Sequence, residues 1–268
     1  ALNCSPDHPH VQSHPEWFFH EEDGTIKFAE NPPKKYEDIY PYDYFNENWK
    51  ELWKEIRDML LFWVEEGFTI FRIDNPHTKP FQFWEWVIRE VKLRHPEVVF
   101  LSEAFTRPKM MKRLAKLGFD MSYTYFTWRN ERWEIEEYLN ELTNPPVSET
   151  MRGIFFPTTP DIHPKILWNA PREAFMVRFI LASTLNSTYG IYSGYELCEN
   201  EPFHDGIKEE LADSEKYEFK VRDWNARGNI KELIAKVNAI RKSNVALQEY
   251  DNLTFHSCDN QQLISYSK

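Results

Sequence analysis

Three predicted strands of this chain are each followed, within a few residues, by an acidic side chain. These side chains are Asp74, Glu103 and Asp161. In parallel α/β folds, the groups that do chemistry gather at the C-terminal ends of the strands. The strands before Asp74 and Glu103 are consecutive, so we expect these two carboxyls to lie at the same end of the sheet.

A neighbouring Asp and Glu are suited to glycoside chemistry. Retention requires a carboxylate nucleophile and a carboxylic acid about 5–5.5 Å apart. Arg72 lies two residues before Asp74, so both side chains leave the same side of the strand, and the cation favours an ionised Asp74. Glu103 follows an apolar run, which raises its pKa and suits a proton donor. Alternatively, strand-end carboxylates cap the next helix or pair with arginine, although that explains one of them better than all three.

Two clusters near the N-terminus carry further polar groups. His8, His10 and His14 with Asp7 match no zinc spacing and have no Cys-x-x-Cys partner, so we interpret them as loop histidines and expect no metal. The stretch 31–36 combines two lysines with Asn and Tyr, which either bind an anion or form an exposed turn. No phosphate-binding glycine motif and no nucleophilic serine elbow occurs, so no cofactor is expected.

The composition limits the class of protein. The chain has 268 residues, of which 41% are hydrophobic, enough for a sizeable core. With 32 Lys and Arg against 43 Asp and Glu, the net charge of −11 argues against a binder of duplex nucleic acid. The longest apolar run, 59–64, is far too short to span a membrane. Three cysteines fit a reducing, cytoplasmic compartment, and 16% aromatic residues favour a carbohydrate ligand.

Helices and strands alternate along the chain between two loop-rich stretches, 1–48 and 199–228. Apolar periodicity predicts helices over residues 49–64, 81–91, 109–117, 133–142, 172–185 and 230–240. Apolar runs predict strands over residues 68–73, 98–101, 119–125, 153–156 and 189–192, and a hairpin of 253–256 with 263–266. Such alternation indicates parallel βαβ units. Five strands fit a doubly wound sheet, whereas a (β/α)8 barrel needs about three more, so the strand count alone favours the doubly wound sheet.

Several short motifs favour a different fold from the one that the strand count favours. Phe71-Arg72-Ile73-Asp74 resembles the second signature region of the α-amylase superfamily of glycoside hydrolases and transglycosylases, whose Asp is the nucleophile. Phe100-Leu101-Ser102-Glu103-Ala104 resembles the third region, whose Glu is the acid/base. Thr159-Pro160-Asp161 departs from the His-Asp pair that ends the fourth region. Together with residues 4–9, 30–40 and 75–80, this departure resembles one branch, which uses maltose 1-phosphate as donor.

The resemblance implies a fold and a domain organisation that override the strand count. It implies an α/β chain that is an incomplete (β/α)8 TIM-type barrel, from about the end of strand three to strand eight. Residues 1–45 would be a loop-rich excursion after strand three, 46–245 the partial catalytic barrel, and 246–268 the start of a C-terminal β-sandwich domain. On this interpretation the chain is a piece of a longer enzyme.

The resemblance also implies a reaction, namely retaining transfer of maltosyl from maltose 1-phosphate to the non-reducing end of an α-1,4-glucan. The catalytic residues it implies are Asp74 as nucleophile, Glu103 as acid/base, Asp161 on the donor hydroxyls and Arg72 beside Asp74. The residues implied to contact the phosphate are Asn31, Lys34, Tyr36 and Asn75. It further implies a homodimer that binds neither nucleic acid nor membrane. An α-glucan hydrolase and a non-catalytic glucan-binding fragment are the alternatives.

Overall fold

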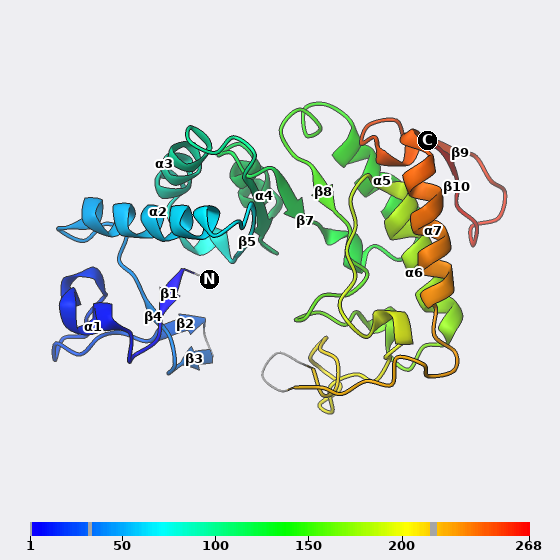
Figure 1. Ribbon diagram of the computed structural model, residues 1–268. Coiled ribbons are helices and arrows are strands. Elements are labelled where there is room, and N and C mark those ends of the chain that lie inside the picture. The colour runs from blue at the N-terminus through cyan, green and yellow to red at the C-terminus, as the bar shows by residue number, and fades with distance from the viewer. Residues whose placement is uncertain (1, 32–33, 215–218) are drawn as a thin grey trace. The chain divides into compact units, whose positions relative to one another are not determined.

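The computed structural model describes residues 2–31, 34–214 and 219–268 (Figure 1). The chain separates into two compact units, Ala1–Met121 and Ser122–Lys268, which are described one at a time. Among the described residues, no helix combines the length and the apolar character needed to cross a membrane.

The first part of unit 1 consists of short elements joined by loops. These are β1 (Asn3–Cys4), α1 (Pro9–Ser13), η1 (Pro15–Trp17), β2 (Ala29–Asn31), β3 (Lys34–Tyr36) and β4 (Tyr40–Pro41). β1 pairs with β4, and β2 with β3, in both cases antiparallel. Aromatic side chains are buried in this part, although its sequence has no apolar periodicity. Trp17, Phe18 and Tyr42 are each less than 9% exposed. The stretch expected to be an ordered loop region therefore contributes buried aromatic side chains to the hydrophobic cluster that it shares with the rest of unit 1.

The second part of unit 1 alternates helices with parallel strands. Its elements are α2 (Trp49–Glu65), β5 (Ile70–Asp74), η2 (Pro76–Thr78), α3 (Phe81–Lys92), β6 (Val99–Glu103) and α4 (Pro108–Ala115). Gly67 follows α2 at a φ of 96°, where a side chain would be strained, so the helix stops where the sequence predicts. β5 and β6 pair in parallel register from Ile70↔Val99 to Asp74↔Glu103. The expected βαβ unit is confirmed.

Unit 2 carries fewer strand residues than the sequence predicts. Its elements are β7 (Met121–Tyr123), which begins at the last residue of unit 1, then η3 (Tyr125–Trp128), α5 (Arg132–Thr143), β8 (Gly153–Ile154), η4 (Lys165–Leu167), α6 (Arg172–Leu185), η5 (Tyr195–Leu197), α7 (Lys231–Ser243), η6 (Val245–Gln248), β9 (Thr254–His256) and β10 (Ser265–Ser267). β7 and β8 pair in parallel over two positions. The strand predicted at 189–192 is reduced to one parallel bridge, Phe155↔Tyr189. The C-terminal hairpin is confirmed as antiparallel β9 and β10.

The core of unit 2 forms around α6, half of whose residues are buried. Phe175, Phe179 and Ala182 have no exposed surface, and Val237 of α7 packs into the same cluster. Arg178 is also buried, and its guanidinium donates to the Phe126 and Arg129 carbonyls at 2.6 and 2.7 Å. These bonds offset part of the cost of burying the charge, and they join α6 to the turn after β7.

Candidate active site

The ends of β5 and β6 bring two carboxyl groups into direct contact. Asp74 and Glu103 are register partners at the last position of the parallel pair, and their side chains are hydrogen-bonded to each other. Retaining enzymes hold their two carboxyls closer together than inverting enzymes, which leave room for a water between them. The expected placement of both groups at adjacent strand ends is therefore found, while their catalytic roles stay predictions.

The surroundings of Glu103 raise the pKa of its carboxyl. Only 6% of its surface is exposed, and this burial is the main cause that raises the pKa of its carboxyl. Asp74 raises that pKa further, whereas Arg72 and the Asn75 backbone N–H lower it. The net direction is upward, as the apolar run before Glu103 predicts from sequence. A protonated Glu103 beside Asp74 can serve as a general acid.

Arg72 contacts the carboxyl across the strands. Its Nη2 lies 3.7 Å from Glu103 Oε1, and 38% of the Arg72 side chain is exposed. The sequence predicts that Arg72 acts on Asp74, two residues later on the same strand, and that role stays a prediction. The ion pair with Glu103 was not foreseen. Arg72 pairs with Leu101 across the strands, so Glu103 is its diagonal neighbour, which the long arginine side chain reaches.

Hydrogen bonds connect the loop after β5 to the end of β6 and to α3. Asn75 has left-handed backbone angles, φ 47° and ψ 49°, and its N–H donates to the Glu103 carbonyl at 3.0 Å and to Oε2 at 3.3 Å. The indole of Trp84, which has no exposed surface, donates to the Pro76 carbonyl at 2.8 Å. The loop is thus tied both to the acid and to the hydrophobic core.

Two basic residues of this loop were not expected as site residues. Burial lowers the pKa of the His77 imidazole, and it lowers the pKa of the Lys79 ammonium to about 8. In both cases the charge of Asp74 acts in the opposite direction. The sequence signal was their position, three and five residues after the strand-end Asp74.

The predicted phosphate-contact residues lie in unit 1, three on the β2–β3 hairpin and one directly after β5. Asn31 pairs with Lys34 across the strands, and Tyr36 pairs with Ala29. Tyr36 is 37% exposed, whereas the side chains of Asn31 and Lys34 and the whole of residues 32–33 lie outside what the structure describes. Asn75 is exposed directly after β5. The anion site therefore stays a prediction.

Asp161 lies in unit 2, in a turn after β8. The turn is closed by an antiparallel bridge between Thr159 and Ile162, and the Asp161 N–H donates to Thr159 Oγ1 at 3.2 Å. Asp161 itself is exposed, and its role as a site residue stays a prediction.

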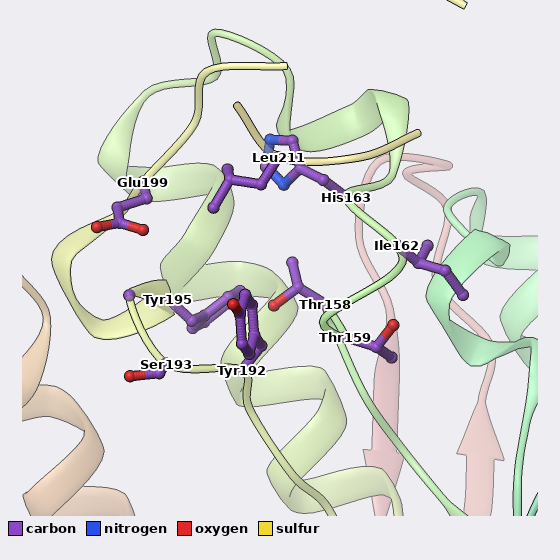
Figure 2. A pocket seen from close by; sticks show the side chains of 10 residues that line it. Thr158, Thr159, Ile162, His163, Tyr192, Ser193, Tyr195, Glu199 and Leu211 are labelled. Atoms are coloured by element: carbon purple, nitrogen blue, oxygen red, sulfur yellow. The ribbon is translucent and has the colours of Figure 1, made fainter. Parts of the chain in front are cut away.

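Next to this turn lies a small pocket, with Tyr192 on one side and His163 on the other (Figure 2). Its lining residues are Thr158, Thr159, Ile162, His163, Tyr192, Ser193, Gly194, Tyr195, Glu199 and Leu211.

The N-terminal histidines lie in α1 and at its two ends. His14 stacks on Trp17 with ring centroids 3.9 Å apart, and His10 Nδ1 lies 2.9 Å from the Tyr42 hydroxyl. Among the described residues, no group of three or more His, Cys, Asp or Glu is arranged to bind a metal ion.

Sequence comparison extends these observations. No family model matches the chain. The chain is 56% identical over 269 residues to the α-1,4-glucan:maltose-1-phosphate maltosyltransferase of Methylacidiphilum infernorum, and 54% identical over 268 residues to that of Myxococcus xanthus. Both alignments cover 100% of this chain. The chain is homologous to these maltosyltransferases. It spans about 40% of the length of each of the two relatives.

Solved structures establish the fold. An α-amylase from Lactobacillus plantarum aligns with a TM-score of 0.70 over 98% of this chain and 62% of its own, at 20% identity. An α-amylase from H. orenii gives a TM-score of 0.71 over 98% of this chain and 65% of its own, at 14% identity. The expected incomplete (β/α)8 barrel is confirmed as the fold that these structures share with the chain. The doubly wound sheet favoured by the strand count is wrong, because a count of strands does not reveal whether the sheet closes.

The buried acid gives a first testable prediction, on stability. A Glu103→Gln variant is expected to raise the free energy of unfolding at pH 7 by about 1 kcal/mol, because Gln has no charge to desolvate and can still donate to Asp74. A carboxyl whose folded pKa is raised favours the folded state below its ordinary pKa, and this contribution is lost as the pH rises through the raised value.

The measurement is urea unfolding of both proteins between pH 4 and pH 8. The gain from Glu103→Gln should grow with pH, while the same change at the exposed Glu22 should leave stability within about 0.5 kcal/mol at every pH. A gain at Glu103 that does not depend on pH would contradict the assigned cause.

Proposed function

We propose that the protein containing this chain transfers maltosyl from maltose 1-phosphate to the non-reducing end of an α-1,4-glucan, with retention of configuration. The observation that carries the proposal is the hydrogen-bonded Asp74 and Glu103 pair at neighbouring strand ends, in which the pKa of Glu103 is raised. Homology to maltosyltransferases over the whole chain supports the choice of donor and acceptor.

The reaction proceeds in two displacements. Asp74 attacks the anomeric carbon of the donor, the bond to the phosphate oxygen breaks, and a β-maltosyl enzyme forms while Glu103 protonates the leaving oxygen. The acceptor then enters, Glu103 removes the proton from its 4-hydroxyl, and that oxygen attacks the anomeric carbon and releases Asp74. Each displacement inverts the carbon, so the product keeps the α configuration. The raised pKa of Glu103 supports its first role, and its return to the protonated state completes the cycle.

The other predicted residues assist these steps. Asp161 hydrogen-bonds donor hydroxyls as the sugar ring distorts, and Arg72 stabilises the ionised state of Asp74. The residues that we propose contact the departing phosphate are Asn31, Lys34, Tyr36 and Asn75. Their amide, ammonium and hydroxyl groups supply donors for phosphate oxygens.

Two other functions remain as alternatives. A plain α-glucan hydrolase would use the same carboxyls but would have no use for an anion site. A glucan-binding fragment would use the aromatic side chains without turnover. A chimeric enzyme tests all three, with this chain replacing the aligned 269-residue segment of the Methylacidiphilum relative. Phosphate release with glucan growth supports transfer, maltose release without growth supports hydrolysis, and binding without either product supports the third function.

Further proposals concern the setting of the enzyme. We propose that it is cytoplasmic, consistent with three free cysteines among the described residues, and that it acts as a homodimer without a cofactor in α-glucan or glycogen synthesis. We also propose the division into an excursion (1–45), a partial catalytic barrel (46–245) and the start of a β-sandwich domain (246–268).

The phosphate contact gives a second prediction. In the chimera, Lys34→Ala should raise the KM for maltose 1-phosphate about tenfold or more, because an ammonium is lost from the phosphate. The Kd of a neutral maltooligosaccharide should change by less than about twofold. The adjacent Lys35 is the matched control, since its Nζ faces Glu30 at 3.7 Å on the surface, and Lys35→Ala should leave both constants unchanged. Equal losses for both ligands with Lys34→Ala would remove the phosphate assignment.

A further inference from the structure

A chain of hydrogen bonds joins the first strand of unit 1 to the loop after β5. Lys79 Nζ donates to Asn3 Oδ1 at 2.8 Å and to Thr78 Oγ1 at 3.3 Å. Thr78 Oγ1 in turn donates to the Asn75 carbonyl at 2.8 Å, and the Thr78 N–H donates to the same oxygen at 3.1 Å. Lys79 donates in both directions, and the Thr78 hydroxyl accepts from Lys79 while it donates to Asn75, so every member can be satisfied at once.

The end of this chain is the residue that contacts the acid. The Asn75 N–H donates to both the carbonyl and the carboxyl of Glu103, and it can do so because Asn75 has a left-handed φ of 47°. That conformation is costly for a residue with a side chain, although Asn tolerates it better than most. The surrounding contacts must therefore stabilise it, and the bonds from Thr78 to the Asn75 carbonyl are placed to do so.

The other end of the chain is anchored as well. Asn3 lies in β1 and pairs with Pro41 of β4, while the Tyr44 hydroxyl donates to the neighbouring Leu2 carbonyl at 3.4 Å. Lys79 itself is partly buried. Its ammonium thus joins two segments that are 76 positions apart in the sequence. Few arrangements of the loop would preserve all of these contacts.

We propose that Asn3, Lys79 and Thr78 form a latch that keeps Asn75 left-handed and its N–H against Glu103, which makes Lys79 a positioning residue for the acid/base. The catalytic meaning of this latch rests on the proposed function, whereas its geometry does not. The Asn75 N–H lowers the pKa of Glu103, and Arg72 and Asp74 are the charged groups facing the same carboxyl. Release of the latch therefore raises that pKa further.

The test uses NMR on the 268-residue chain and needs no turnover. The readouts are the pH titration of the Glu103 carboxyl carbon and the hydrogen-exchange rate of the Asn75 amide. Thr78→Val, which removes the hydroxyl at nearly constant shape, and Asn3→Ala should each shift the Glu103 pKa upward. Both should also speed Asn75 exchange about tenfold. Thr78→Ser keeps the hydroxyl and should behave like the unaltered chain.

Thr25→Val is the matched control, because the Thr25 side chain is exposed and its hydroxyl donates to the nearby Asp23. It should change neither readout. Faster Asn75 exchange with an unchanged Glu103 titration would reduce the latch to a structural contact and overturn the proposal, as would no change in either readout. Transfer activity of the chimera is measured separately, so failure of the latch and failure of the proposed function give different results.

Discussion

Replacing Asp74 by alanine in the chimera should lower kcat/KM for maltosyl transfer at least about ten-thousandfold. The variant keeps Glu103 and the sugar contacts but has no group to attack the anomeric carbon, so the covalent step is lost. The measurement is phosphate release with glucan growth under the same conditions for both proteins. Asp58→Ala is the matched control, because Asp58 lies exposed on α2 beside Arg57, and it should stay within about twofold.

Adding azide to the Asp74→Ala variant tests the direction from which the anomeric carbon is attacked. Azide is a small anionic nucleophile that fits the space of the missing Asp74 carboxylate, and it approaches the same face of the donor. Asp74→Ala with azide should therefore restore phosphate release and give a β-maltosyl azide, the anomer expected from a single displacement. Unimpaired transfer by Asp74→Ala would show that Asp74 is not the nucleophile. Rescue that gives only the α anomer would contradict the direction of attack.

The second large effect concerns the isolated chain. The 268-residue chain should transfer maltosyl at least about a thousandfold more slowly than the chimera that contains it. Catalytic groups must be placed to within about 0.5 Å, and a donor that lacks part of its surroundings is poorly oriented and exposed to water. The chain spans 40% of the Methylacidiphilum relative, so the remaining segments of that relative supply contacts in the chimera. The measurement compares purified chain, chimera and relative side by side, and equal turnover by chain and chimera would refute the expectation.

Much of unit 1 could be predicted from sequence because its signals are local. Apolar residues at helical spacing from Trp49 and the stop at Gly67 locate α2, and the run ending at Glu103 locates β6. The neighbourhood of Asp74 and Glu103 follows from the same logic, since consecutive parallel strands expose their ends together. The raised pKa of Glu103 followed from the apolar residues around it.

Other features depend on contacts that a linear pattern does not contain. The apolar run at 153–156 forms a strand only over Gly153–Ile154, and Phe155 adds a single bridge to Tyr189, because pairing requires a partner in register. Lys79 and Asn3 are 76 positions apart, and no sequence pattern in either segment predicts the hydrogen bond between them. The barrel fold likewise could be predicted only from specific motifs, since periodicity counts strands without saying how the sheet ends.

The bond from the Trp84 indole to the Pro76 carbonyl has a consequence for motion. Trp84 is fully buried on α3, so moving Pro76 away would leave an indole N–H unsatisfied inside the core, at a cost of about 1–3 kcal/mol. We therefore expect the loop after Asp74 to move together with α3 and not independently of it. Any opening that admits a bulky glucan must come from other segments of the protein.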